Sequence, residues 1–259
     1  MSFIEPLLTA EAVSLLYKGL TRAALDHVSV QVQPGRTLGV VGESGSGKSS
    51  LARVLLGLER LSGGCVRYRG RDIEGFDRRE RLDFRRKVQM VFQDPFNSLN
   101  PRMTIGATLG EVLRVHRING ESPASLLKKV GLDAAMAERY PHELSGGQRQ
   151  RVGIARAISL QPDIIIADEP VSALDVSVQA HILNLLKRLV QETGVTLILI
   201  AHDLAVVRQI CDDIFVMNEG IIVEQGDAAG VLGNPESPYT KQLIASIPVL
   251  DHVGFTNPG

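Results

Sequence analysis

Residues 42 to 50 read Gly42-Glu43-Ser44-Gly45-Ser46-Gly47-Lys48-Ser49-Ser50. This stretch fits the phosphate-loop pattern G-x-x-x-x-G-K-[ST], and it directly follows a run with strand character at Thr37–Val41. Glycines in such a loop let backbone N–H groups curl around phosphate oxygens, and a helix beginning near Ser49 adds a favourable dipole. We expect all nine residues to contact a nucleotide, with Lys48 on the β- and γ-phosphates and the Ser49 hydroxyl on Mg²⁺. A Gly/Ser-rich turn without a ligand is the alternative, and the intact spacing argues against it.

A second motif is an apolar strand that ends in two acids, Ile164-Ile165-Ile166-Ala167-Asp168-Glu169. The carboxyl end of a strand is where an α/β fold presents groups to its ligand. We expect Asp168 to hold the Mg²⁺ shell and Glu169 to act as the general base that orients the attacking water. An isolated pair of this kind more often forms a solvated acidic turn. Beside a phosphate loop it indicates nucleotide hydrolysis.

A third motif, Leu144–Gln148, precedes an amphipathic helical pattern. Ser145 and Gln148 have the spacing of a capping box, which predicts a helix start with its N-terminal amides pointing outward. Such an end suits phosphate. Taken alone, the pattern indicates a helix start as readily as a binding site.

In this order and spacing, the three motifs resemble the nucleotide-binding domain of ATP-binding-cassette (ABC) proteins, and the resemblance covers nearly the whole chain. It implies a head-to-tail dimer in which ATP on one subunit's phosphate loop is covered by Ser145, Gly146, Gly147 and Gln148 of the other. Both halves of that arrangement are present here. The resemblance therefore implies an active ATPase that uses ATP and Mg²⁺, and it leaves open whether the second ATP-binding subunit is the same or a related chain.

The resemblance also implies roles for four further residues. Gln93 matches the glutamine-loop residue that contacts Mg²⁺ or water, and His202 matches the switch histidine that touches the γ-phosphate. Asp175, in Ser172–Asp175, matches the aspartate loop that contacts the other subunit. Tyr17 falls where the family places an aromatic ring on adenine, although a tyrosine at a strand end is also common as a core-edge residue.

The patterning predicts an α/β fold. Continuous apolar runs are typical of parallel strands buried on both faces, and they lie at Lys87–Phe92, Asp163–Ala167, Thr196–Ala201 and Asp213–Met217. Strand-like runs at Ala12–Tyr17 and Ala24–Val32 predict a small antiparallel sheet before them. Between Gly106 and Ile158 the apolar residues fall at helical spacing.

We therefore expect a P-loop NTPase core, a mainly parallel sheet flanked by helices, with an N-terminal antiparallel β subdomain and an inserted α-helical subdomain. The whole of 1–259 is expected to be a single ABC ATPase domain. Residues 1–96 and 161–225 would form the core, 97–160 the helical signature subdomain, and 226–259 a short helical tail.

Composition narrows the class of protein. Of 259 residues, 44% are hydrophobic and 22% charged, which argues against disorder and coiled coil. The net charge of -1 provides no field that would attract nucleic acid, and we expect no nucleic-acid partner. Cys65 and Cys211 lack the spacing of a metal or redox motif. The N-terminus does not read as a secretory signal, and no apolar run approaches the roughly 20 residues of a membrane span.

Two stretches narrow the resemblance further. Val88–Arg102 and Ser237–Leu243 are similar to segments of bacterial importers of oligopeptides, dipeptides and nickel. This implies a peripheral subunit on the cytoplasmic face of the inner membrane, bound to two transmembrane permease subunits and served indirectly by a solute-binding protein. The alternative is a soluble ABC-type ATPase not engaged in transport, but the paired cassettes or long insertions of such relatives are not seen. The transported solute cannot be read from the sequence.

Overall fold

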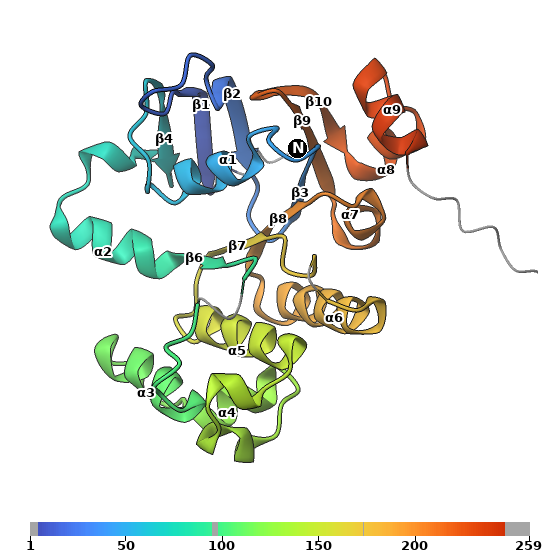
Figure 1. Cartoon of the computed structure of the whole chain (residues 1–259). Helices are drawn as coiled ribbons and strands as arrows, with labels where there is room; N and C mark the ends of the chain where they lie inside the picture. The colour runs from blue at the N-terminus through green and yellow to red at the C-terminus, as the bar shows by residue number, and fades with distance from the viewer. Residues whose placement is uncertain (1–4, 95–97, 173, 247–259) are drawn as a thin grey trace, which may run out of the picture.

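Figure 1 shows the computed structural model of the chain, which describes residues 5–94, 98–172 and 174–246. Its centre is a six-stranded sheet with the strand order β10-β9-β3-β8-β7-β6. Strands β9, β3, β8, β7 and β6 run parallel, and β10 pairs antiparallel with β9 at one edge. In chain order these strands are β3 (Thr37–Val41), β6 (Val88–Val91), β7 (Ile164–Asp168), β8 (Thr196–Ala201), β9 (Asp213–Asn218) and β10 (Ile221–Asp227).

Both faces of the central sheet are covered. Every residue of β3, β7 and β8 is buried, and neighbouring residues of one strand pack into opposite cores: Ile198 faces one hydrophobic cluster and Leu199 the other. This explains why these strands are almost wholly apolar and do not alternate, with polar residues only at their ends: Thr37, Thr196 and Asp168. The register brings their carboxyl ends to one edge, because Val41 pairs with Ala201 and Asp168 with Ile200.

A second, antiparallel sheet with the order β2-β1-β4-β5 lies beside the core, as expected for the N-terminal part. Its strands are β1 (Leu8–Leu15), β2 (Leu25–Val32), β4 (Gly63–Tyr68) and β5 (Arg71–Asp72). The predicted strand Ala12–Tyr17 begins four residues after the observed strand β1 (Leu8–Leu15) begins, and it ends two residues after β1 ends. A bulge explains this, because the register shifts between Ala10 and Val13, and Ala12 has φ 47°, so side-chain alternation is interrupted where the pattern was read.

Different helices pack on the two faces of the central sheet. Helix α1 (Lys48–Leu55) packs in the same core as the antiparallel sheet, while α5 (Gly146–Ile158), α6 (Val176–Thr193) and α7 (Leu204–Ile210) pack on the other face. The remaining helices are α2 (Arg78–Lys87), α3 (Ile105–Val115), α4 (Pro123–Lys129), α8 (Ala228–Gly233) and α9 (Pro238–Ala245), with short 3₁₀ turns η1 (Ile73–Gly75), η2 (Ala134–Glu138) and η3 (Pro141–Glu143). Among the residues that the structure describes, no helix is long and apolar enough to cross a lipid bilayer.

The helices α3, α4 and α5, which lie between β6 and β7 in the chain, gather at one end of the molecule (Figure 1). Of the apolar residues that fall at helical spacing in the sequence, Val112 is half-buried, and the others are buried: Leu109, Leu113, Leu126, Leu127 and Val130. Side chains start two of these helices: Thr104 caps α3, and Ser122 caps α4. Residues 95–97, where the predicted insertion begins, lie outside the described residues.

Candidate functional site

The phosphate loop connects β3 to α1, and two of its positions require glycine. Gly42 has φ 151°, and a Cβ there would lie 2.1 Å from the backbone oxygen of Met217. Gly47 has φ 104°, and a Cβ there would lie 2.6 Å from the backbone oxygen of Ala24. Neighbouring backbone therefore leaves no room for a side chain, and the loop is folded against two other segments of the core.

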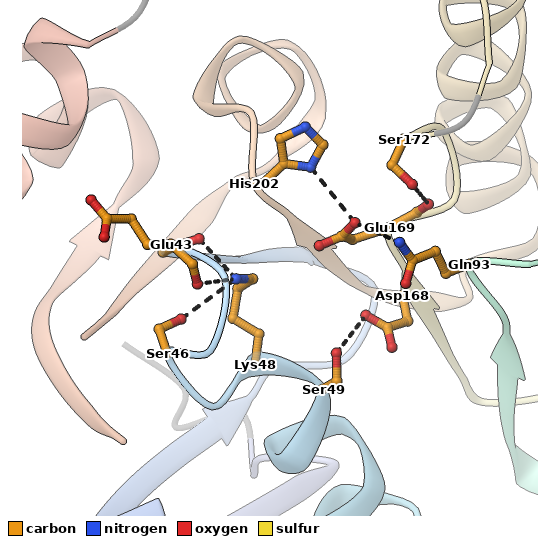
Figure 2. Close-up of polar contacts among 10 residues, drawn as sticks. Glu43, Ser46, Lys48, Ser49, Gln93, Asp168, Glu169, Ser172 and His202 are labelled. Carbon is orange, nitrogen blue, oxygen red and sulfur yellow. Dashed lines mark hydrogen bonds and ion pairs between the residues drawn. The ribbon is translucent and has the colours of Figure 1, made fainter. Parts of the chain in front are cut away.

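Lys48 is folded back onto this loop. Its ammonium donates to the carbonyls of Gly42 at 2.8 Å and Glu43 at 2.7 Å, and lies 3.5 Å from Ser46 Oγ (Figure 2). The side chain is buried, and desolvation lowers its pKa from the ordinary value of 10.5 although the carboxylates of Glu169 and Asp168 oppose the shift. A buried cation held mainly by carbonyl oxygens is well placed to transfer to a phosphate.

A cavity of about 590 Å³ opens beside the loop, and residues from other segments complete its lining. Glycines and serines of the loop form one wall, and Gln93, Glu169 and His202 form another. The lining residues are Ala24, Ser44, Gly45, Gly47, Lys48, Ser49, Ser50, Gln93, Glu169 and His202. Four segments that are far apart in the sequence thus meet here, because the carboxyl ends of β3, β6, β7 and β8 share one edge of the sheet.

Asp168 lies at the end of β7, directly opposite the start of α1. It is 8% exposed, and its Oδ1 accepts a hydrogen bond from Ser49 Oγ at 3.3 Å. Desolvation raises the pKa of Asp168 above its ordinary 3.8, the hydrogen bond from Ser49 opposes this, and the neighbouring charge of Glu169 adds to it. The positive charges of Arg53 and Lys48 also oppose the shift, but desolvation outweighs them, so the native site disfavours the ionised carboxylate.

These observations fit a Mg²⁺ site. A hydroxyl and a buried carboxylate, both oxygen donors, lie within hydrogen-bond distance of each other beside the phosphate loop. Across the described ranges, no group of three His, Cys, Asp or Glu residues is placed to hold a metal ion. The donor set therefore suits an ion that takes its remaining oxygens from phosphate and water.

Glu169 is held in an unusual conformation. Its φ is 43°, a left-handed value that is rare outside glycine, and its N–H donates to the carbonyl of Ile200 at 3.0 Å. The carboxylate accepts a hydrogen bond from Gln93 Nε2 at 3.0 Å, and His202 Nδ1 lies 3.7 Å away (Figure 2). Its backbone carbonyl also accepts a bond from the Ser172 hydroxyl at 3.2 Å. Backbone strain of this kind is typical of functional positions.

Ser145 begins α5 and forms the expected capping box: its N–H donates to Gln148 Oε1 at 2.9 Å, and its hydroxyl accepts from the Gln148 N–H at 3.3 Å. Gly147 packs so closely on α6 that a Cβ would lie 2.4 Å from Val178 Cγ1, and Gly146 faces Leu174. None of Ser145, Gly146, Gly147 and Gln148 lines the cavity. Within one chain, the structure does not bring this motif to the phosphate loop.

Asp175 and Tyr17 are also placed outside the cavity wall. Asp175 stands at the start of α6 and makes no side-chain capping bond there; Ala173, in the same predicted loop, lies outside the described residues. The Tyr17 hydroxyl lies 3.3 Å from Ser50 Oγ and 3.2 Å from Glu59 Oε1, so the ring stands next to the last residue of the loop. Contact of Asp175 with a second subunit and of Tyr17 with adenine stay predictions.

Two residues near the site were not anticipated. Ala24, immediately before β2, lines the cavity, and no sequence pattern marks it as a site residue. The hydroxyl of Tyr239 accepts a hydrogen bond from the N–H of Glu43 at 3.0 Å. The segment Ser237–Leu243 is the only signal that points to Tyr239, and the sequence connects that segment with a group of relatives and not with the phosphate loop.

Comparison with known protein families matches residues 25–172 to the family described as ABC transporter. The putative oligopeptide transport ATP-binding protein YkfD of Bacillus subtilis (strain 168) is 49% identical over 240 residues, which cover 90% of this chain and 73% of that protein. The oligopeptide transport ATP-binding protein OppF of Salmonella typhimurium is 49% identical over 237 residues, 89% of this chain and 71% of that protein. A solved dimeric post-hydrolysis state of the ATP-binding cassette MJ0796, bound to ADP and Pi, matches with a TM-score of 0.74 at 31% identity, covering 85% of this chain and 98% of that one.

The fold and the cavity define an α/β nucleoside triphosphatase of the phosphate-loop class. Within that class, the chain belongs to the ABC transporter family, because the family match spans more than half of its length and close relatives align over most of it. It binds ATP and hydrolyses it, which is the chemistry of this family. The resemblance inferred from the motifs is confirmed.

Proposed function

We propose that the chain is the ATP-hydrolysing subunit of an importer for peptides, or for nickel and other metal chelates. The observation that carries the proposal is the 49% identity, over 90% of the chain, to a protein named for oligopeptide transport. In this role the chain binds two transmembrane permease subunits at the cytoplasmic face of the inner membrane, and a solute-binding protein delivers the cargo to them.

The working unit is a head-to-tail dimer. In one chain, Ser145–Gln148 lies at the start of α5 and does not reach the cavity that Lys48 lines. A second chain, the same or a related one, supplies the missing wall: its α5 N-terminus directs free amides and a positive dipole end at the γ-phosphate. Asp175 contacts the partner at this junction. The comparison with a dimeric cassette bound to ADP and Pi supports this arrangement.

Binding of ATP begins at the phosphate loop. The amides of residues 44–50 surround the phosphates, and Lys48 moves from its carbonyl partners to the β- and γ-phosphate oxygens. Ser49, Asp168 and Gln93 hold Mg²⁺, which when bound neutralises charge that develops on the phosphate oxygens. Tyr17 stacks on adenine.

Hydrolysis then needs an oriented water molecule. Glu169 accepts a proton from the water as its oxygen bonds to the γ-phosphorus, and the bond from that phosphorus to the β,γ-bridging oxygen breaks to release ADP. Gln93, hydrogen-bonded to the Glu169 carboxylate, fixes the direction of the base. His202, 3.7 Å from the same carboxylate, contacts the γ-phosphate.

In this role, the parts of the chain have different tasks. Residues 1–96 and 161–225 carry the nucleotide, 97–160 form a signature subdomain that moves with the permease, and 226–259 form a tail. Gln93 lies on the segment that leads from β6 into the helical part, so it connects the base to that subdomain.

Reconstitution tests this function. The chain, the membrane subunits encoded with it and the solute-binding protein are assembled in vesicles, and ATP hydrolysis is measured with peptides and with chelated Ni²⁺. We expect one of these solutes to stimulate hydrolysis and to accumulate inside the compartment. A chain that associates with no membrane subunit, while hydrolysing ATP alone, would instead be a soluble ABC-type ATPase.

A further inference from the structure

The last described helix, α9, touches the phosphate loop. The N–H of Glu43 donates to the Tyr239 hydroxyl at 3.0 Å, although the two residues are 196 positions apart. This contact does not depend on a loose tail. Both oxygens of Glu224 in β10 accept from backbone N–H groups at the start of α9, those of Glu236 at 2.7 Å and Ser237 at 3.1 Å. The sheet thus holds the helix that carries Tyr239.

The side chains around this contact also fix the helix. Thr240, next to Tyr239, has no exposed surface, and the Tyr239 ring packs against the main hydrophobic cluster. This packing places the hydroxyl beside the loop, at the point where β3 ends.

The hydrogen bond matters because of the peptide group that it joins. The N–H of Glu43 and the carbonyl of Gly42 belong to one planar peptide unit. That carbonyl accepts from Lys48 Nζ at 2.8 Å. The unit is therefore held at both ends, by Tyr239 at its N–H and by Lys48 at its oxygen, and each bond polarises the group for the other.

Without the hydroxyl, this peptide would rotate more freely. Gly42 has no side chain to restrict it and has φ 151°. Rotation would move the carbonyl that orients Lys48 and would change the direction in which the following loop amides point. A loop that must be ordered by ATP binds it more weakly than one already ordered.

We propose that Tyr239 is a positioning residue for ATP binding, which holds the Gly42–Glu43 peptide so that the phosphate loop is formed before the nucleotide arrives. This inference rests on the proposed role of the phosphate loop and of Lys48. Tyr239 does not line the cavity, so it acts through the loop and does not contact the reacting atoms. Its effect falls on affinity for ATP and leaves the chemical step unchanged.

The test is Tyr239→Phe in the full chain, which removes one hydroxyl and keeps the ring. We expect the Kd and KM for ATP with Mg²⁺ to rise about fivefold, as the loss of one hydrogen bond predicts, with kcat within about twofold of wild type. Hydrogen exchange at the Glu43 amide should become faster in the nucleotide-free chain. Tyr140→Phe is the matched control: Tyr140 is an exposed residue, and its variant should keep the wild-type constants.

Two further variants make the test decisive. Glu224→Ala releases the start of α9 and should raise KM in the same direction; an unchanged KM contradicts the inference. An unchanged Kd in Tyr239→Phe overturns it, and so does a fall in kcat and melting temperature together, which marks a general structural role. Lys48→Ala distinguishes failure of this inference from failure of the proposed function. If Lys48→Ala weakens ATP binding and Tyr239→Phe does not, only the role of Tyr239 is wrong. If Lys48→Ala leaves ATP binding unaltered, the proposed role of the phosphate loop is wrong.

Discussion

Gln93 donates a hydrogen bond from its side-chain amide to the Glu169 carboxylate across 3.0 Å. The two residues come from different parts of the chain, since Gln93 follows β6 on the way into the helical segment and Glu169 follows β7. A change in the position of that segment therefore changes the orientation of the candidate base. In this way one contact connects the proposed signature subdomain with hydrolysis.

Replacing Glu169 by Gln should nearly abolish turnover and keep ATP binding. The amide can hold water but cannot accept its proton, and the loss of a general base costs about a hundredfold or more in kcat. ATP is then trapped, so the closed dimer should accumulate. Hydrolysis rates and size-exclusion chromatography with ATP measure both effects; undiminished hydrolysis would rule out Glu169 as the base.

Lys48→Ala should weaken ATP binding about a hundredfold, because it removes charge-assisted hydrogen bonds to phosphate in a partly desolvated site. Calorimetric titration of the full chain with ATP and Mg²⁺ measures this. Lys187→Ala, which removes an exposed lysine from α6, is the control and should bind normally. Equal affinities in the two variants would contradict the assignment.

Asp168→Asn should stabilise the chain without Mg²⁺ while it abolishes the response to the ion. Burial raises the pKa of Asp168, so the native state disfavours the ionised group. The protonated Asp168 therefore contributes to the free energy of unfolding. This contribution is fully present below the ordinary pKa of 3.8 and is lost as the pH rises through the higher native pKa. At neutral pH the Asn variant avoids this loss, and its melting temperature should rise by about 2 °C, the shift that about 1 kcal/mol produces in a chain of this size.

The control for this prediction is Asp83→Asn, on the exposed face of α2, which should change the unfolding free energy by less than about 0.5 kcal/mol. Differential scanning fluorimetry with and without Mg²⁺ and nucleotide follows all three proteins. A lower melting temperature for Asp168→Asn in the absence of Mg²⁺ would show that the native site does not disfavour the ionised carboxylate.

Gly147→Ala should destabilise the junction of α5 with α6, because a Cβ there would lie 2.4 Å from Val178 Cγ1. Overpacking of this kind costs about 1–3 kcal/mol. Gly153 is in the same helix with nothing within 4 Å of its Cβ position, so Gly153→Ala should stabilise the chain by up to about 1 kcal/mol. Denaturant unfolding compares the pair, and equal stabilities would argue against the close packing.

Local patterns predicted the chemistry at the site well. Gln93, Glu169 and His202 each lie within two residues of a strand end. Because buried parallel strands have continuous apolar sequences, β3, β7 and β8 could be located and their ends aligned. The capping box at Ser145 was predictable for the same reason, because both partners lie within one turn. Parallel pairing then brings Lys48 and Glu169 to one cavity.

Contacts between distant segments could not be predicted in this way. The short strands β4 and β5 and the edge strand β10 alternate little and are only partly buried, so their patterns are weak. A backbone bulge at Ala12 interrupts the alternation of β1, so the predicted bounds of that strand were wrong. The bond between Glu43 and Tyr239 depends on how α9 docks on Glu224, which no local spacing records.

The central claim is that two chains complete one ATPase site, and mixing two inactive variants tests it most directly. Lys48→Ala disables the phosphate loop, and Ser145→Arg disables the signature motif. In a head-to-tail dimer of one chain of each kind, one site combines both defects and the other is intact. The account predicts that each variant alone is inactive and that an equal mixture regains about a quarter of the wild-type rate of ATP hydrolysis. For a dimer of two copies of this chain, a mixture as inactive as its components would contradict the claim, because each chain would then carry a defective site of its own.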